Sequence, residues 1–219
     1  MRYTRAVLDH RYIVIEGPPG VGKTALAERL AARFDATAVL EDTENPFLQD
    51  FYADRPGSAF QVQLFFLLSR HRQQLSLGQA DLFSQLVVSD CLFERDRVYA
   101  YLNLDDNELF IYQRLYDLLV RDVPSPDLVV YLQAPTEALV KRQRDRGRDP
   151  ERPNRPSADY LKRTNEAYQH FFFHHEATPL LVVETSQVDL VRGDAPLEDL
   201  VRQIRGFGGG TRYYVPRAT

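Results

Sequence analysis

The chain has one cysteine and one methionine among its 219 residues, and it contains no tryptophan. The lone cysteine, Cys91, cannot form an internal disulfide and has no neighbours at a metal-ligand spacing, which suits a reducing cytoplasm. Basic residues are not in excess, because 27 Lys and Arg stand against 31 Asp and Glu. A formal net charge of -4 argues against binding of a nucleic-acid polymer, so any positive site must be local.

Long apolar runs are missing as well. None approaches the ~18 to 20 residues that a membrane-spanning helix needs, so neither a membrane partner nor a signal peptide is expected. The length and a hydrophobic content of 44% are sufficient for one α/β domain. Low-complexity sequence is limited to the glycines at 206–210, which predict a folded domain over residues 1–206 and a flexible C-terminal tail over 207–219.

Five short runs rich in aliphatic and β-branched residues predict parallel strands, at 12–16, 37–41, 86–90, 128–133 and 180–184. Helical segments lie between them, including a long one at 59–77 and another at 158–175. This alternation predicts an α/β fold: a five-stranded parallel sheet with helices on both faces, in three layers. Glu16, Glu41 and Asp90 end three of these strands, at the edge where open α/β sheets bind ligands.

Residues 17–24 read Gly-Pro-Pro-Gly-Val-Gly-Lys-Thr, which matches the phosphate-binding P-loop between a strand and a helix. The loop's N–H groups face phosphate oxygens, its lysine supplies charge to the β and γ phosphates, and its threonine hydroxyl can bind Mg²⁺. The residues expected to hold the triphosphate are Gly17, Gly20, Val21, Gly22, Lys23 and Thr24.

A P-loop is shared by switch GTPases, transport ATPases and small-molecule kinases, so other residues must decide between them. The base-specifying N-K-x-D sequence of switch GTPases is absent. Asp90 has the position of the acid in an ATPase motor, but no second carboxylate adjoins it. A small-molecule kinase is therefore favoured.

Several segments together resemble the deoxynucleoside kinase family, and within it the bacterial deoxyadenosine and deoxyguanosine kinases. They cover most of the chain, at 15–24, 41–52, 63–72, 90–97 and 142–148, and include Leu-Glu-Asp-Thr-Glu-Asn-Pro-Phe at 40–47. The resemblance implies a P-loop kinase fold, an arginine-bearing lid at about 142–156, ATP and Mg²⁺ as cofactors, and a homodimer. It also implies nucleotide salvage, by transfer of a phosphoryl group to the 5′-hydroxyl of a deoxynucleoside, most simply a purine.

On the acceptor side, the resemblance makes Glu41 the carboxylate that accepts the proton of the 5′-hydroxyl, with Asp42 and Glu44 as nearby alternatives. Gln63 and Arg70 lie seven residues apart, so both leave one face of a helix, and the family places such a pair against the nucleobase. Asp96 would face the base beside Arg70 or form a structural ion pair with it. Tyr52 would form part of a stacking wall.

Asp90 resembles the start of a family motif in which an acid is followed by Arg-Ser and later by Asp-Arg. Asp96-Arg97 keep the second part, but Cys91-Leu92 replace the Arg-Ser pair. Arg95 lies one helical turn from Cys91, and we expect it to reach back into the space of the missing arginine. Asp90 itself is expected to help Thr24 hold Mg²⁺.

Arg142, Arg146 and Arg148 match the family's lid, whose arginines close over the triphosphate, because guanidinium groups grip phosphate oxygens with two donors. The segment 188–196 corresponds in position to the loop around the adenine of the donor. Two alternatives stay open: a thymidylate kinase-like nucleoside monophosphate kinase, and a non-catalytic nucleotide-binding protein. The preferred base depends on one or two hydrogen bonds in the pocket.

Overall fold

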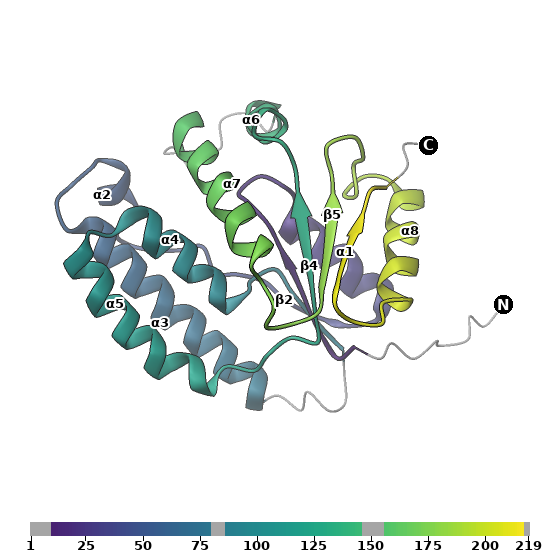
Figure 1. The fold of residues 1–219 in the computed structure, drawn as a ribbon, viewed down its shortest axis with the longest axis horizontal. Coiled ribbons are helices and arrows are strands. Elements are labelled where there is room, and N and C mark those ends of the chain that lie inside the picture. The colour runs from purple at the N-terminus through teal and green to yellow at the C-terminus, as the bar shows by residue number, and fades with distance from the viewer. Residues whose placement is uncertain (1–9, 80–85, 146–155, 217–219) are drawn as a thin grey trace.

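A computed structural model describes residues 10–79, 86–145 and 156–216 (Figure 1). Helices and strands alternate along the chain, as the sequence pattern predicts. The strands are β1 Tyr12–Glu16, β2 Thr37–Val39, β3 Val87–Ser89, β4 Leu128–Gln133, β5 Leu180–Glu184 and β6 Thr211–Tyr214. The α-helices are α1 Lys23–Phe34, α2 Leu48–Tyr52, α3 Ser58–Gln79, α4 Asp96–Asn103, α5 Asp106–Leu119, α6 Thr136–Asp145, α7 Ala158–Phe173 and α8 Asp194–Arg205. Two 3-10 turns, Phe93–Arg95 and Val120–Asp122, precede α4 and follow α5.

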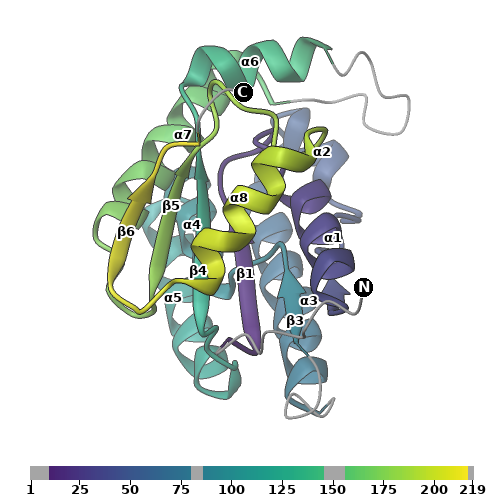
Figure 2. The same cartoon turned by 90° about the vertical axis from the view of Figure 1, so that its right-hand side faces the viewer.

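The strands form one parallel sheet in the order β2-β3-β1-β4-β5-β6. All five residues of β1 are buried, as expected for an interior strand covered on both faces. Side chains alternate between the faces: Ile13 and Ile15 pack with α1 and α8, whereas Tyr12 and Val14 pack towards α7. Figure 2 shows α1 and α8 side by side on one face. The predicted three-layer α/β fold is confirmed.

A further core lies away from the sheet. Leu67 of α3, Phe93 and Ala100 pack against Tyr112 and Tyr116 of α5. The helices α3, α4 and α5 thus form a small bundle beside the sheet, and Figure 1 shows α3 and α5 running alongside each other. This bundle holds the long helix that carries the predicted base-binding residues.

The C-terminal end of the chain corrects two predictions. The sheet has six strands rather than five, and residues 207–216 are not a flexible tail, because β6 pairs with β5 from Leu180↔Thr211 to Val183↔Tyr214. Phe207 is buried in the core, and the Tyr214 hydroxyl bonds to Asp199 of α8. The glycines at 208–210 form the turn that brings the chain back to the open edge of β5. Residues 217–219 lie outside the described residues.

Within the described residues, no helix is long and apolar enough to cross a bilayer. The described residues contain only part of the predicted lid, since α6 contains Arg142 and ends at Asp145. Arg146 and Arg148 lie outside the described residues.

Candidate active site

The P-loop joins β1 to α1 in a conformation that requires glycine. Gly20 and Gly22 have φ of +85° and +108°, in the left-handed region. A side chain on Gly17 would place its Cβ 2.5 Å from the Leu132 carbonyl oxygen. The first turn of α1 has no side-chain cap, so its N–H groups are directed at the loop, where they can bind a phosphate.

Lys23 folds across this loop, and its Nζ donates to the Gly17 carbonyl oxygen at 2.7 Å. The same Nζ lies 4.0 Å from the Glu16 carboxylate. Burial lowers the pKa of Lys23, although Glu16 acts in the opposite direction. Lys23 is therefore held beside the P-loop, where the negative charge of a bound triphosphate would balance its positive charge.

Asp90, immediately after β3, connects the two predicted halves of the site. Its Oδ2 accepts a hydrogen bond from Thr24 Oγ1 at 2.5 Å, and its Oδ1 accepts one from the Glu41 backbone N–H at 2.7 Å. The two residues predicted to hold the metal are thus brought together. A hydroxyl and a carboxylate oxygen at one spot fit Mg²⁺, which prefers oxygen ligands and keeps several waters. Among the described residues no group of three or more His, Cys, Asp or Glu side chains could hold a metal ion.

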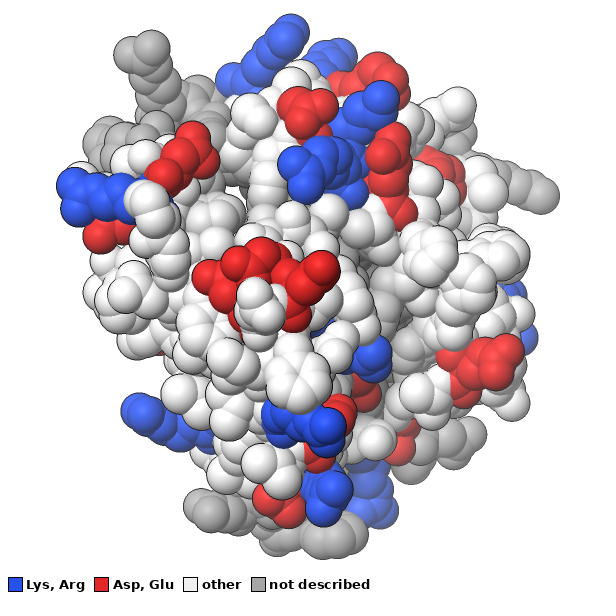
Figure 3. Space-filling view, turned by 60° about the vertical axis from the view of Figure 1, so that its left-hand side comes forward, with Lys and Arg blue, Asp and Glu red and all other residues white. Residues whose placement is uncertain are grey.

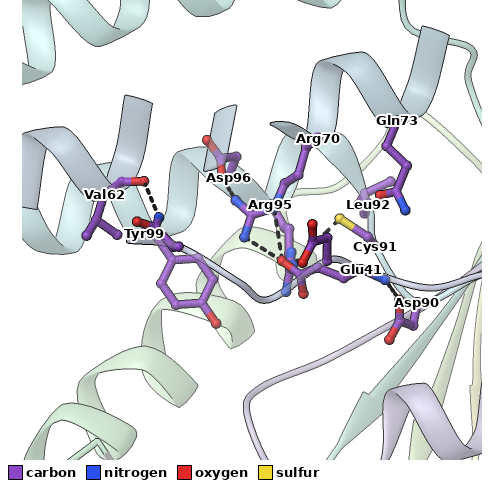
Figure 4. A network of polar contacts seen from close by, with 12 residues as sticks. Glu41, Val62, Arg70, Gln73, Asp90, Cys91, Leu92, Arg95, Asp96 and Tyr99 are labelled. Atoms are coloured by element: carbon purple, nitrogen blue, oxygen red, sulfur yellow. Dashed lines mark hydrogen bonds and ion pairs between the residues drawn. The ribbon is translucent and has the colours of Figure 1, made fainter. Parts of the chain in front are cut away.

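Glu41 lies just beyond β2, and two arginines hold its carboxylate (Figure 4). Arg70 of α3 donates to Glu41 Oε1 from Nε at 3.0 Å and from Nη2 at 2.5 Å, and Arg95 Nη2 forms an ion pair with the same oxygen. Burial acts to raise the pKa of Glu41, but the charges of Arg95 and Arg70 outweigh it and hold that pKa well below its usual range. Glu41 is therefore ionised, and the two arginines fix the orientation of its carboxylate.

Arg95 reaches the space beside Cys91, as the one-turn spacing predicts. Its Nη2 lies 3.6 Å from Cys91 Sγ, and its Nε lies 3.5 Å from Glu16 Oε2. Burial raises the pKa of the Cys91 thiol to about 11, so the thiol stays neutral. The Arg95 guanidinium, between Glu16 and Glu41, thus contacts the substituted position.

The predicted base-binding residues lie on α3 and α4. Arg70 forms an ion pair with Asp96, whose Oδ2 accepts a hydrogen bond from the Tyr112 hydroxyl at 2.6 Å. Gln63 is 3% exposed, and its Oε1 has no hydrogen-bond partner among the described residues. Tyr52, in contrast, is 38% exposed at the end of α2.

Arg142 of α6 contacts the end of β5 and the P-loop. Its Nη1 donates to Thr185 Oγ1 at 3.1 Å and to the Val21 carbonyl oxygen at 3.4 Å, and its Nη2 donates to the Thr185 carbonyl oxygen. Of the three predicted lid arginines, it is the one that the described residues contain. It lies beside the loop that would hold the phosphates.

Glu16 is a site residue to which the sequence assigned no role. It is fully buried, and its carboxylate accepts hydrogen bonds from the N–H groups of Gly17 at 2.9 Å and Leu92 at 3.0 Å. It also accepts one from the Tyr168 hydroxyl at 3.3 Å, besides facing Arg95. The available signal was an acid in a strand that is otherwise entirely apolar, directly before a P-loop. Glu16 connects the P-loop to the turn that carries Cys91.

The surface agrees with the overall charge balance. On the face drawn in Figure 3, acidic and basic side chains are interspersed rather than gathered into one broad basic area. Such a face offers no extended track for a polyanion.

Comparison with known proteins gives consistent results. Residues 13–207 match the deoxynucleoside kinase family. A deoxyguanosine kinase of Bacillus subtilis (strain 168) is 30% identical over 200 residues, which cover 89% of this chain and 96% of that protein. A deoxyadenosine/deoxycytidine kinase of the same organism is 28% identical, over 88% of this chain and 90% of that protein.

Among solved structures, the deoxyadenosine kinase of M. mycoides with bound dATP has the same fold. It aligns with a TM-score of 0.71 and 24% identity, over 88% of this chain and 97% of that chain. The family match spans the P-loop, Glu41, the α3 residues and Asp90. The chain therefore belongs to the deoxynucleoside kinase family and is a deoxynucleoside kinase.

Proposed function

We propose that the enzyme transfers the γ-phosphoryl group of ATP to the 5′-hydroxyl of a purine deoxynucleoside, in nucleotide salvage. One observation carries the proposal: Asp90 binds the Thr24 hydroxyl with one oxygen and the Glu41 backbone with the other. Thr24, which would help to hold the metal of the donor, and Glu41, which would accept the proton of the 5′-hydroxyl, are thus bound by the same carboxylate. Phosphoryl transfer depends mainly on such positioning and on charge stabilisation.

On the donor side, the P-loop N–H groups and Lys23 would hold the phosphates. Thr24 and Asp90 would hold Mg²⁺, which when bound neutralises phosphate charge. Arg142, beside Val21 and Thr185, is in place to contact a phosphate oxygen if its present hydrogen bonds rearrange. We assign the same role to Arg146 and Arg148, on the basis of the lid resemblance.

On the acceptor side, Glu41 accepts the proton of the attacking hydroxyl. Its pKa is held low by Arg95 and Arg70, which makes it a weak base, so its larger contribution is to orient the hydroxyl. We assign Arg95 to the position of the arginine replaced by Cys91. Its Nη2 already contacts Glu41 Oε1, within reach of a hydroxyl bound there.

Gln63, Arg70 and Asp96 would recognise the base. The Gln63 amide offers both a donor and an acceptor, and its open Oε1 can accept from an exocyclic amino group. Arg70 and Asp96 hold each other in a fixed orientation beside it. A purine is supported by the names of the relatives, which include deoxyguanosine and deoxyadenosine kinases. Tyr52, exposed at the end of α2, would stack on the bound nucleoside.

We also propose a homodimer in the cytoplasm. Apolar side chains on one side of α5 are exposed, with Phe110 at 59%, Ile111 at 48% and Leu118 at 61%, which suits burial against a second copy. The single cysteine is free and buried, in keeping with a reducing compartment.

The test is to incubate the purified protein with Mg-ATP and a panel of deoxynucleosides and deoxynucleoside monophosphates, and to identify the products by mass spectrometry. A 5′-monophosphate should form from a purine deoxynucleoside, and a Lys23→Ala variant should form none. Conversion of a monophosphate to a diphosphate, without product from any deoxynucleoside, would falsify the proposal.

A further inference from the structure

The loop that joins β5 to α8 is held by a single guanidinium group from α1. Arg29 Nη1 donates to the carbonyl oxygens of Leu190 at 3.0 Å, Val191 at 2.8 Å and Gly193 at 3.1 Å. Its Nη2 pairs with Asp194 Oδ1 at 2.5 Å, at the start of α8. Arginine suits this task because its planar fork carries several donors and never loses its charge.

The N–H groups of the same loop are bound from within. Asp189 Oδ1 accepts from the N–H groups of Val191 at 2.9 Å and Arg192 at 3.0 Å, and the Gly193 N–H donates to the Asp189 carbonyl oxygen at 3.2 Å. Leu190 is buried in the core at the centre of the loop. Two side chains, Asp189 and Arg29, therefore set the shape of a segment that has no secondary structure of its own.

This loop lies against the P-loop. A Cβ atom built on Gly22 would come within 3.2 Å of Val191 Cγ2. Gly22 immediately precedes Lys23, so Val191 packs at the start of α1, next to the place of the phosphates. A side chain at residue 22 would crowd Val191, so glycine at this position lets the loop pack close to the P-loop.

The strand order indicates which part of the donor reaches the loop. The acceptor groups Glu41 and Asp90 follow β2 and β3, on one side of β1, whereas the loop follows β5, on the other side. A triphosphate held over the end of β1 must direct its γ-phosphoryl group towards Glu41. Its nucleoside end must then extend to the side of β4 and β5, where residues 189–193 lie.

We propose that Arg29 is a positioning residue for the nucleoside end of the phosphate donor. It acts through the loop and not by contact with the donor. Arg29 and Lys23 belong to the same helix, so α1 fixes the distance between the loop and the phosphate-binding groups. The inference rests on the proposed function for the identity of the donor, but its test measures binding as well as turnover.

Arg33 provides a matched control. It lies one turn further along α1, and its guanidinium pairs with both carboxylate oxygens of Glu198 in α8, at 2.5 and 3.0 Å. Arg33→Met thus removes a cation that connects the same two helices and leaves the three loop carbonyls with their donor. Arg29→Met removes the donor to those carbonyls.

The experiment compares wild type, Arg29→Met, Arg29→Lys and Arg33→Met. The dissociation constants of Mg-ATP and of inorganic tripolyphosphate are measured by calorimetry, and KM and kcat are measured with the preferred deoxynucleoside. Arg29→Met should raise Kd and KM for ATP by about 10- to 100-fold, the size of a positioning defect. Tripolyphosphate affinity, kcat at saturating ATP and KM for the deoxynucleoside should stay within about twofold of wild type, an effect of less than half a kcal/mol.

The Kd and KM for ATP of Arg29→Lys should lie between those of wild type and Arg29→Met, because one ammonium group cannot donate to three carbonyls and Asp194 together. Arg29→Lys also provides the test if Arg29→Met does not fold. ATP affinity unchanged in the Arg29 variants, or reduced equally in Arg33→Met, would overturn the inference, as would an equal loss of tripolyphosphate affinity. If wild type binds ATP but phosphorylates no deoxynucleoside, the proposed function fails while the binding comparison still tests Arg29.

Discussion

Glu41 lies in a closely defined arrangement of charges. Two guanidinium groups hold its Oε1, and its own N–H is bound to Asp90. Glu41→Gln keeps the size of the side chain and removes its charge. We expect kcat to fall by about 10²- to 10⁴-fold, because the hydroxyl loses both its orienting partner and its proton acceptor, with the Kd for ATP unchanged. Steady-state kinetics and calorimetry on the same preparation test this, and full retained turnover would remove Glu41 from its proposed role.

The ionisation of Glu41 also predicts how stability depends on pH. Burial acts to raise its pKa, yet Arg95 and Arg70 hold it below the usual value of 4.5. A carboxyl group whose pKa is lower in the folded state stabilises the fold fully above the unfolded-state pKa. This contribution is lost as the pH falls through the folded-state value. The difference in Tm between wild type and Glu41→Gln should therefore be constant above about pH 5 and shrink towards pH 3. A difference that grows on acidification would contradict this charge arrangement.

Arg95 is expected to take the place of an arginine that the family has at the position of Cys91. Arg95→Ala should lower kcat/KM by about 10²- to 10³-fold, as when a donor to the reacting oxygen is removed. Arg97→Ala is the control, because that side chain is exposed and rests over the rings of Tyr101 and Tyr116. If Arg95→Ala left kcat/KM intact while Asp90→Ala abolished activity, Arg95 would not take the place of the arginine replaced by Cys91.

For single residues, the sequence predicts which side chains lie at the site better than it predicts which residues they contact. Thr24, Glu41 and Asp90 could be placed together because parallel strands end at one edge of a sheet. The Arg95 side chain could be placed because one helical turn separates it from Cys91. Glu16 could be placed at the ligand-binding edge but given no role, since its hydrogen bonds to Leu92 and Tyr168 join segments 76 and 152 residues apart. Contacts of that kind leave no local pattern.

Among the elements, β6 has no counterpart in the sequence prediction. Its four residues pair with β5, and the Tyr214 hydroxyl bonds to Asp199 of α8. Deleting residues 208–219 should lower the free energy of unfolding by roughly 2 kcal/mol, from the lost cross-strand pairs, and Tm by about 4–8 °C. Thermal unfolding measures this. A chain that lacks only residues 217–219 serves as the control, and an equal Tm for both truncations would show that β6 adds nothing.

The elements that could be predicted have patterns of their own. The strand at 12–16 and the helix that follows the P-loop are fixed by a continuous apolar run and a motif. The helix predicted at 59–77 is observed as Ser58–Gln79. β6 is different because Thr-Arg-Tyr-Tyr behind three glycines is too short to show a period. Its stability comes from the open edge of β5, which is visible only once the sheet is assembled.

For the whole molecule, the exposed side of α5 predicts assembly. Phe110, Ile111 and Leu118 are all at least 48% exposed, and Arg114 lies over the Phe110 ring. Wild type should sediment as a dimer, and Leu118→Asp should shift it towards the monomer, because a charge buried at an interface is costly. Phe173→Asp is the control, since Phe173 is 77% exposed at the end of α7. A wild-type monomer at micromolar concentration would contradict the prediction.

The direction of β6 has a practical consequence for labelling. All six strands run parallel, so the chain leaves β6 at the edge where the P-loop and Glu41 lie. Val215 and Pro216 line the same hollow as Ala195 and Pro196, at the start of α8. An affinity tag or a fluorescent protein fused directly after Pro216 would be tethered at the edge of the sheet where the P-loop lies. A partner joined directly ahead of Tyr12 would start from the opposite edge of the sheet, away from the P-loop and Glu41.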